Sequence, residues 1–198
     1  MKRYSEHNED EFLDRYFKDV NAGFFVDIGA NDGVKGSNTR KLYDKGWSGV
    51  CVEPALDSFA ALERNYANQN RVRLVHGAVT DVSGPVTFYQ HKKLEFCGLN
   101  SAHKRWADLF DPGTWDEFSI QSFRLEDLEL PPTFDFLSVD TEGGDLLIIS
   151  QLDGTIRPRL ICAEMDKFDY GDKIRECLAA KGYKHLLDVE SNGFFERV

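Results

Sequence analysis

Residues 24–33 read FFVDIGANDG, an apolar segment that runs directly into an acidic residue and a loop punctuated by glycine. Aromatic and β-branched residues in such a run predict a strand over residues 24–28 that is buried on both faces of a parallel sheet. Gly29 and Gly33 allow turn conformations and leave room for a ligand against the backbone. Asp27 arrives at the carboxyl end of the strand, where open α/β sheets bind ligands. The segment therefore predicts an α/β fold with a ligand site at this strand end.

The glycine pattern of the loop narrows the class of ligand. A dinucleotide fingerprint has the form Gly-x-Gly-x-x-Gly, but Asn31 and Val34 stand where its second and third glycines belong. This departure disfavours a pyrophosphate ligand and a nicotinamide-dependent oxidoreductase. An acidic residue two positions before Gly29, with a further glycine four positions after it, suits a ligand that carries an ammonium group and no pyrophosphate. S-adenosylmethionine is such a ligand; the alternative is a tight strand-to-helix turn without a ligand.

The length and composition predict one domain. The chain has 198 residues, of which 41% are hydrophobic, and can therefore bury one substantial core over residues 1–198. Its net charge of −10 argues against a surface adapted to nucleic acid. The first residues lack the apolar centre of a secretory signal, and no apolar run approaches the ~20 residues that span a bilayer. We expect a cytoplasmic protein without a membrane span, and the sequence leaves its oligomeric state open.

Strand and helix patterns alternate along the chain, which predicts a parallel sheet with helices on both faces. A leading helical segment is expected within residues 1–20, and SNG at residues 191–193 predicts a C-terminal hairpin. Residues 90–117 lack periodicity and are predicted to form an insertion or lid loop. The remaining predicted strands are 48–53, 71–75, 86–89, 134–139 and 160–163. A first crossover helix is predicted between the capping residues 37–39 and Gly46, and the remaining predicted helices are 56–66, 125–128, 143–149 and 174–181.

Several motifs follow one another in a fixed order: YSEHNEDEFL, GFFVDIGANDG, SNT, GWSGVCVEP, SFRLEDLELPPTFDFLSVDTEGGDLLII and RPRLICAEMD. Together they resemble the FkbM-type methyltransferase family. The resemblance implies the Rossmann-like class I methyltransferase fold, with a mostly parallel seven-stranded sheet and an antiparallel strand from the C-terminal hairpin. The chain departs from the family at Gly144, where alanine is frequent, and at Asp145, where glutamate is usual.

The resemblance implies S-adenosylmethionine as cofactor, with its methionine portion facing Asp27 and the following loop. A helix N-terminus at residues 37–38 would receive the carboxylate. Glu53 lies 26 residues after Asp27 at the end of the next strand, where its carboxylate can accept both ribose hydroxyl hydrogen bonds. A solvated strand-end glutamate is the alternative. The expected cofactor-binding residues are Asp27, Gly29, Ala30, Asn31, Gly33, Ser37, Asn38, Glu53, Pro54 and Ala78.

Methyl transfer requires in-line attack on a carbon bound to positively charged sulfur, so the protein has to align the acceptor, exclude water and accept a proton. Asp140, after the strand 134–139, is the first choice for this role, and Glu142 is the second. His103 is a further candidate base, because an unperturbed imidazole titrates near neutral pH. A surface histidine is the alternative for that residue.

Acidic residues also follow the strand 160–163. Glu164 and Asp166 could join Asp140 in an oxygen-rich site for a divalent cation of the magnesium type. The alternative is that these acids bind acceptor hydroxyls or contact solvent, as strand-end acids in this architecture commonly do. The sequence leaves both open.

These observations lead to the expectation of an S-adenosylmethionine-dependent O-methyltransferase. The acceptor, a hydroxyl of a carbohydrate or other small molecule, is implied by the resemblance alone. Two alternatives remain: a nicotinamide-dependent oxidoreductase, and a non-catalytic module that keeps the methyltransferase fold and binds a partner.

Overall fold

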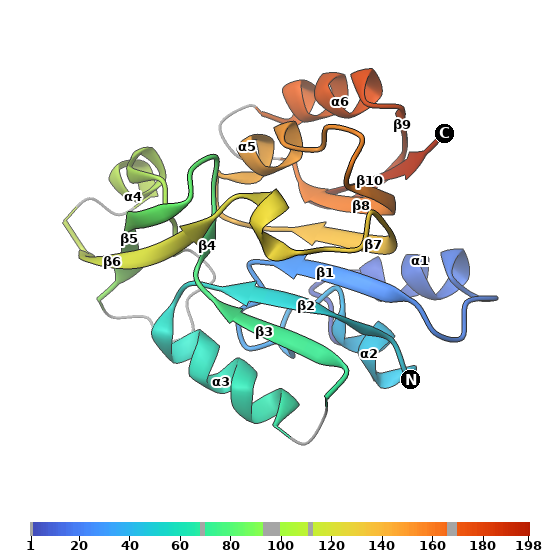
Figure 1. The fold of residues 1–198 in the computed structure, drawn as a ribbon, viewed down its shortest axis with the longest axis horizontal. Coiled ribbons are helices and arrows are strands. Elements are labelled where there is room, and N and C mark those ends of the chain that lie inside the picture. Colours follow the sequence, from blue (N-terminus) through green and yellow to red (C-terminus); the bar gives the residue numbers. More distant parts are fainter. Residues whose placement is uncertain (1, 68–69, 93–99, 111–112, 166–169) are drawn as a thin grey trace.

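The computed structural model describes residues 2–67, 70–92, 100–110, 113–165 and 170–198. Its centre is a seven-stranded sheet with the order β3-β2-β1-β7-β8-β10-β9 (Figure 1). Only β10 runs antiparallel to its neighbours, which confirms the predicted sheet. The strands are β1 (Phe24–Ile28), β2 (Ser48–Glu53), β3 (Val72–His76), β7 (Thr133–Val139), β8 (Arg157–Glu164), β9 (Tyr183–Val189) and β10 (Asn192–Arg197).

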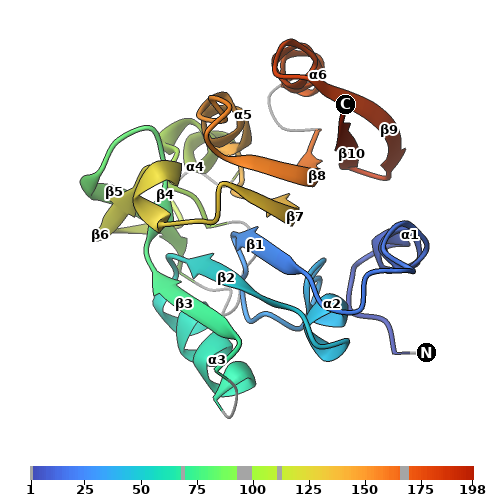
Figure 2. The same cartoon turned by 45° about the vertical axis from the view of Figure 1, so that its right-hand side comes forward.

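The central strands are buried on both faces, because their side chains alternate between two apolar layers. In β1, Phe25 packs into one layer and Val26 into the other, and both side chains are fully buried. Helices cover each layer (Figure 2). The layer of Phe25 contains residues of α1 (Glu9–Tyr16), α2 (Arg40–Asp44) and α3 (Leu56–Tyr66), and the layer of Val26 contains residues of η1 (Leu125–Leu128), α5 (Asp145–Ser150) and α6 (Gly171–Ala180).

A second, three-stranded sheet with the order β4-β6-β5 corrects the prediction for the middle of the chain. Residues 86–89 were predicted to continue the alternation of the main sheet, and residues 90–117 to be irregular. Instead, β5 pairs antiparallel with β6 over its whole length, and a helix lies between them. Three residues of β5 and one of β6 are buried, and the others are half-buried or exposed, so neither strand forms a continuous apolar run in the sequence. The elements are β4 (Ala78–Val79), β5 (Gly84–His91), α4 (Lys104–Phe110) and β6 (Trp115–Phe123).

The C-terminal hairpin forms as predicted, with its turn shifted slightly toward the N-terminus. Asn192 already belongs to β10, and the turn falls on Glu190 and Ser191, with Glu190 at a φ of 50°. Within the described residues, none of the helices is long and apolar enough to cross a bilayer.

Candidate active site

A cavity of about 410 Å³ lies between the carboxyl ends of the central strands and the small sheet. Gly33 is absent from its wall, and Asp166 lies outside the described residues. All other predicted site residues line it, although they come from segments far apart in the chain. They are Asp27, Gly29, Ala30, Asn31, Ser37, Asn38, Glu53, Pro54, Ala78, His103, Asp140, Glu142 and Glu164.

The two glycines of the first loop have different roles. Gly29 has a φ of +87°, and a Cβ atom there would lie 1.8 Å from the carbonyl oxygen of Asp140. The glycine thus lets the ends of β1 and β7 meet at the cavity. Gly33 has a φ of +71°, and its Cβ would lie 2.5 Å from Leu62 of α3. Close packing against α3, rather than contact with the cavity, accounts for this second glycine.

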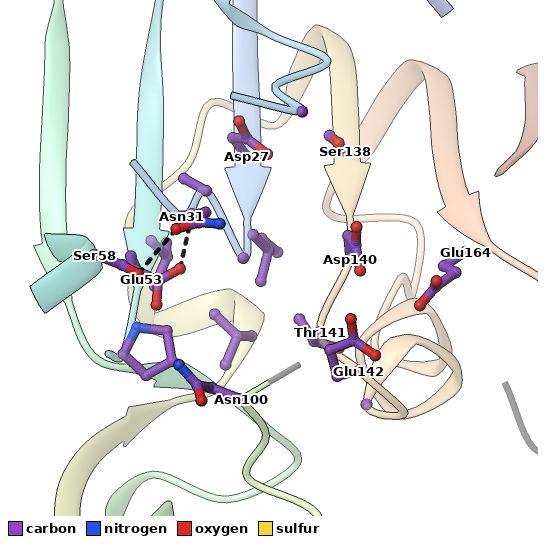
Figure 3. A pocket seen from close by; sticks show the side chains of 18 of the residues that line it. Asp27, Asn31, Glu53, Ser58, Asn100, Ser138, Asp140, Thr141, Glu142 and Glu164 are labelled. Atoms are coloured by element: carbon purple, nitrogen blue, oxygen red, sulfur yellow. Dashed lines mark hydrogen bonds between the residues drawn. The ribbon is translucent and has the colours of Figure 1, made fainter. Parts of the chain in front are cut away.

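Glu53 is fixed in the cavity wall by backbone donors (Figure 3). Its two carboxylate oxygens accept N–H groups from Asn31 and Ala55, each at 2.8 Å. Asn31 adopts a φ of 49°, and Ser58 Oγ donates to its side-chain oxygen at 2.9 Å. Burial raises the pKa of Glu53 to about 7, and the two backbone N–H groups oppose that shift. Each oxygen keeps lone-pair capacity for a further donor.

Asp27 belongs to a polar layer between β1, β7 and the loop before α2. Thr39 Oγ1 donates to its carboxylate at 2.6 Å, and Asn38 Nδ2 donates to Ser138 Oγ at 3.4 Å. Burial, followed by the negative charge of Asp140, raises the pKa of Asp27 to about 6, against the hydrogen bonds from Thr39 and Ser138. The sequence interpretation missed Thr39 and Ser138. Ser138 could have been found, because it is a polar residue near the end of the otherwise apolar segment FDFLSVD.

The turn after β7 presents a group of acids to the cavity. Glu142 and Gly143 both have positive φ values, of 54° and 102°. Asp140, Glu142 and Glu164 each offer a carboxylate oxygen, and these atoms lie within 4.8 Å of one another (Figure 3). Such oxygens suit either a hard divalent cation or the hydroxyl groups of an acceptor.

Asp145, the first residue of α5, supports this turn from beneath. Its carboxylate accepts the Thr141 N–H at 3.3 Å and the Thr141 hydroxyl at 3.4 Å. Burial, with the charge of Asp140 as the next cause, raises the pKa of Asp145 to about 7. Of the two positions that depart from the resembled family, Asp145 is therefore a buried support of the acidic turn outside the cavity wall, and Gly144 lines the cavity.

His103 reaches the same part of the cavity from the small sheet's side. The backbone N–H of His103 donates to Ser101 Oγ at 2.9 Å, and the Ser101 hydroxyl donates to the backbone carbonyl of Glu142 at 2.8 Å. Burial lowers the pKa of His103, so its imidazole is neutral at pH 7 and able to accept a proton. A Cβ at Gly144 would lie 2.9 Å from His103 Nε2. Glycine at this position leaves the space that the imidazole occupies.

The cavity wall is strongly acidic. Among the described residues, Lys35 is the only lysine or arginine that lines it, against seven carboxylates. Two of these, Glu6 and Glu9, come from the N-terminal segment, where the sequence analysis had predicted a leading helix and no site residue. Both residues belong to the motif YSEHNEDEFL, which the sequence analysis used only for the family resemblance. The seven are Glu6, Glu9, Asp27, Glu53, Asp140, Glu142 and Glu164.

Comparison with known proteins gives one family match and several similar structures. A family model described as the methyltransferase FkbM domain matches residues 27–185. The ribosomal protein L11 methylase of Lactobacillus delbrueckii subsp. bulgaricus is 13% identical with a TM-score of 0.54, over 96% of this chain and 77% of that one. A TehB-like SAM-dependent methyltransferase of Corynebacterium glutamicum is 10% identical with a TM-score of 0.52, over 98% and 89%.

A third similar structure is a T. thermophilus 16S rRNA methyltransferase in complex with AdoMet and guanosine. It is 17% identical with a TM-score of 0.53, over 96% of this chain and 42% of that one. A search of curated proteins gives no match. At these identities the similar structures show the fold alone, which is the Rossmann-like class I methyltransferase fold predicted from the sequence.

Proposed function

Because the chain belongs to the methyltransferase FkbM domain family, we propose that it methylates a hydroxyl group of a carbohydrate or other small molecule. The observation that carries this proposal is the Glu53 carboxylate, held by two backbone N–H groups in the wall of a 410 Å³ cavity. A carboxylate held in place at the end of β2 can accept hydrogen bonds from the two ribose hydroxyls of a nucleoside cofactor.

The residues of the cavity fit S-adenosylmethionine, which supplies a methyl group on positively charged sulfur when it is bound. Glu53 would accept the ribose hydroxyls. The backbone at Ala78 would contact the adenine, and Ser37 and Asn38 would contact the carboxylate of the methionine portion. Asp27 would face the ammonium group. Because its carboxylate is buried, a nearby positive charge would strongly stabilise its ionised form.

The acceptor side of the proposal rests on Asp140, Glu142 and His103. Asp140 is exposed at the end of β7 and would orient the acceptor hydroxyl, with Glu142 beside it. The neutral His103 imidazole is available to take the hydroxyl proton as the new carbon–oxygen bond forms.

A small acceptor is favoured over nucleic acid by charge. The chain has a net charge of −10, and among the described residues of the cavity wall one lysine faces seven carboxylates. A phosphate backbone would meet repulsion there. The three carboxylates around Asp140 could also hold a divalent cation beside the acceptor. Unchanged turnover after addition of a chelator would remove that role for them.

The test begins with calorimetric titration of the protein with S-adenosylhomocysteine. Binding at micromolar concentration is expected, and absence of binding at millimolar concentration would refute the proposal. A panel of hydroxylated sugars with methyl-labelled cofactor then identifies the acceptor. Asp140→Asn should abolish label transfer and retain cofactor binding. Cofactor binding by the wild type without transfer to any acceptor would favour the non-catalytic module.

A further inference from the structure

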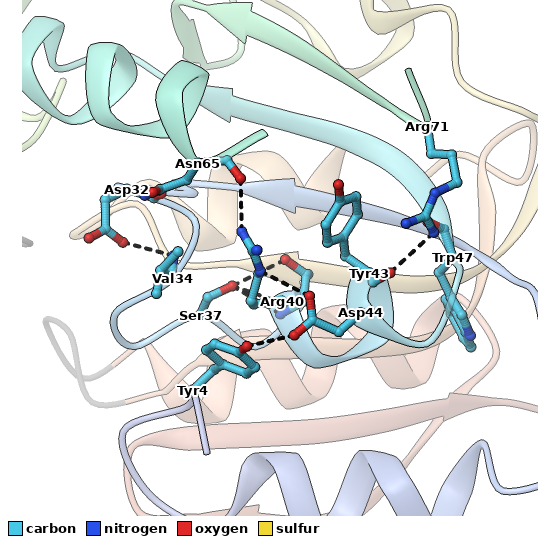
Figure 4. A network of polar contacts seen from close by, with 11 residues as sticks. Tyr4, Asp32, Val34, Ser37, Arg40, Tyr43, Asp44, Trp47, Asn65 and Arg71 are labelled. Carbon is cyan, nitrogen blue, oxygen red and sulfur yellow. Dashed lines mark hydrogen bonds and ion pairs between the residues drawn. The ribbon is translucent and has the colours of Figure 1, made fainter. Parts of the chain in front are cut away.

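A second cleft, of about 310 Å³, lies between α2 and the C-terminal end of α3 (Figure 4). Among the described residues, none that lines this cleft also lines the cavity at the strand ends. Its volume is at the lower end of the range of small-molecule sites. The cleft is therefore a candidate site for a second, smaller ligand.

The charge balance of this cleft is the reverse of that of the cavity. Its described lining residues include three arginines, Arg40, Arg64 and Arg71, and one acid, Asp44. The chain as a whole has 24 lysines and arginines against 34 aspartates and glutamates. The three arginines come from α2, from α3 and from the residue before β3, so the tertiary structure brings them together. A local excess of positive charge in an acidic chain indicates an anion as the ligand.

Arg40 is held in a fixed orientation, with 17% of its side chain exposed. Its Nε donates to Asp44 at 3.2 Å, and its Nη1 donates to the Asn65 carbonyl at 3.2 Å. Its guanidinium carbon also lies 5.0 Å and 5.1 Å from the centroids of the Tyr43 and Tyr66 rings. A guanidinium that is stacked and hydrogen-bonded in this way loses little further entropy when it binds a ligand. Its Nη2, which makes neither hydrogen bond, can donate to an anion.

Arg71 brings a second positive charge to the same aromatic ring. Its guanidinium carbon lies 4.6 Å from the centroid of Tyr43, and its Nη1 donates to the Tyr43 carbonyl at 3.1 Å. Arg40 and Arg71 therefore both contact Tyr43, and their charges are no farther apart than the sum of the two ring distances. Like charges this close repel each other, and a bound anion would offset that repulsion.

Arg64 adds a third charge, which is not neutralised. It lies in the last turn of α3, is exposed, and has no ion-pair partner within the part of the chain that the structure describes. Asp44 already accepts two donors, Arg40 Nε and the Tyr4 hydroxyl at 2.6 Å. Three arginines and one aspartate leave an excess of two positive charges. A phosphate monoester carries about −1.5 to −2 charges at pH 7, and its oxygens accept paired hydrogen bonds from arginine.

We propose that this cleft binds a phosphate group, either free or carried by a small molecule, with Arg40 and Arg64 donating to its oxygens. A nucleic acid would need further basic residues beyond the cleft for successive phosphates. The next basic residues of α2, Lys41 and Lys45, instead pair with Asp14. The site is independent of the proposed function, because the described parts of the cleft and the cavity have separate walls.

The test titrates inorganic phosphate and glycerol 3-phosphate into the protein by calorimetry, at a constant ionic strength set with sodium chloride. Binding with a dissociation constant of about 1 mM or tighter is expected. Arg40→Met should weaken it about 10-fold, because a partly buried charged hydrogen bond is lost. Arg64→Met should weaken it about 3-fold, since Arg64 is exposed. Both probes support the site: tighter binding of the ester assigns it to a phosphorylated small molecule, and equal binding assigns it to free phosphate.

Arg15→Met is the matched control, because it removes the same charge from an exposed arginine of α1 that pairs with Glu11 outside the cleft. It should leave the binding of both probes unchanged. Absence of binding at ten times the expected dissociation constant would overturn the inference, as would equal effects of Arg15→Met and Arg64→Met. If Arg40→Met unfolds the protein, Arg64→Met decides, and unchanged phosphate binding overturns the inference. Single-stranded RNA that binds more tightly than both probes, and loses affinity in the same variants, would overturn the assignment to a small ligand.

Discussion

Replacing Asp27 with asparagine should stabilise the ligand-free protein and weaken its binding of S-adenosylhomocysteine. Asp27 is 5% exposed and accepts hydrogen bonds from hydroxyl groups, and the negative charge of Asp140 acts on its carboxylate. Burial raises its pKa from 3.8 to about 6, so the charged form is less stable in the folded chain than in the unfolded one. Asparagine keeps the shape and an acceptor for Thr39 without the charge.

The sign and the size of the effect follow from this pKa. A raised pKa in the folded state gives stability that is present below pH 3.8 and is lost as the pH rises through about 6. The full shift corresponds to at most ~3 kcal/mol. Roughly half of that loss is already present at pH 5. For a chain of this size, a gain of ~3 kcal/mol in the free energy of unfolding would raise the melting temperature by at most roughly 6–12 °C.

Thermal unfolding of wild type and Asp27→Asn at pH 5 and pH 8 measures the effect. The variant should melt at the higher temperature, and its advantage should grow by ~1–2 kcal/mol from pH 5 to pH 8. Asp32→Asn is the matched control, since Asp32 lies in the same loop outside the cavity wall and should leave ligand affinity unchanged. An Asp27→Asn variant that is less stable at both pH values would show that Thr39 and Ser138 stabilise the carboxylate, and would refute the burial argument.

Three further predictions concern the cavity wall. Gly29→Ala should lower the free energy of unfolding by more than ~3 kcal/mol in urea titrations. Gly29 has a φ of +87°, and the new Cβ would lie 1.8 Å from the Asp140 carbonyl oxygen. An unchanged urea midpoint would contradict the loop geometry. Gly144→Ala should displace the His103 imidazole and move its NMR-measured pKa up toward 6.5, whereas an unaltered titration would show that the ring does not occupy that space. S-adenosylhomocysteine should bind more tightly as the pH rises through about 7, because ribose hydroxyls favour ionised Glu53, and Glu53→Gln should abolish that trend in calorimetry.

The sequence predicted the core of the fold because the central strands carry their structural information locally. Residues 24–28 and 48–53 form strands with the predicted bounds. Residues 56–66 form a helix, also with the predicted bounds. These segments are buried on one or both sides, so each is visible as a run or period of apolar residues. In the same way, Asp27 and Glu53 could be placed at strand ends, because the strands themselves were clear.

The small sheet and the wall of the cavity could not be predicted in the same way. The sheet depends on pairing between two strands, β5 and β6, in which most residues are half-buried or exposed. Gly33 was expected at the ligand, but the packing of α3 decides its role. Neither feature depends on residues close together in the chain.

The sequence by itself determined the bounds of the central strands β1 and β2 and the family of the chain, and it placed the predicted ligand site at the end of β1. The tertiary structure alone decided which acids share the cavity. It placed Glu9 against Asn192, 183 residues away, and it placed His103 in the space beside Gly144. Local side-chain patterns specify helices and strands, whereas contacts between distant segments are formed only when the whole core packs.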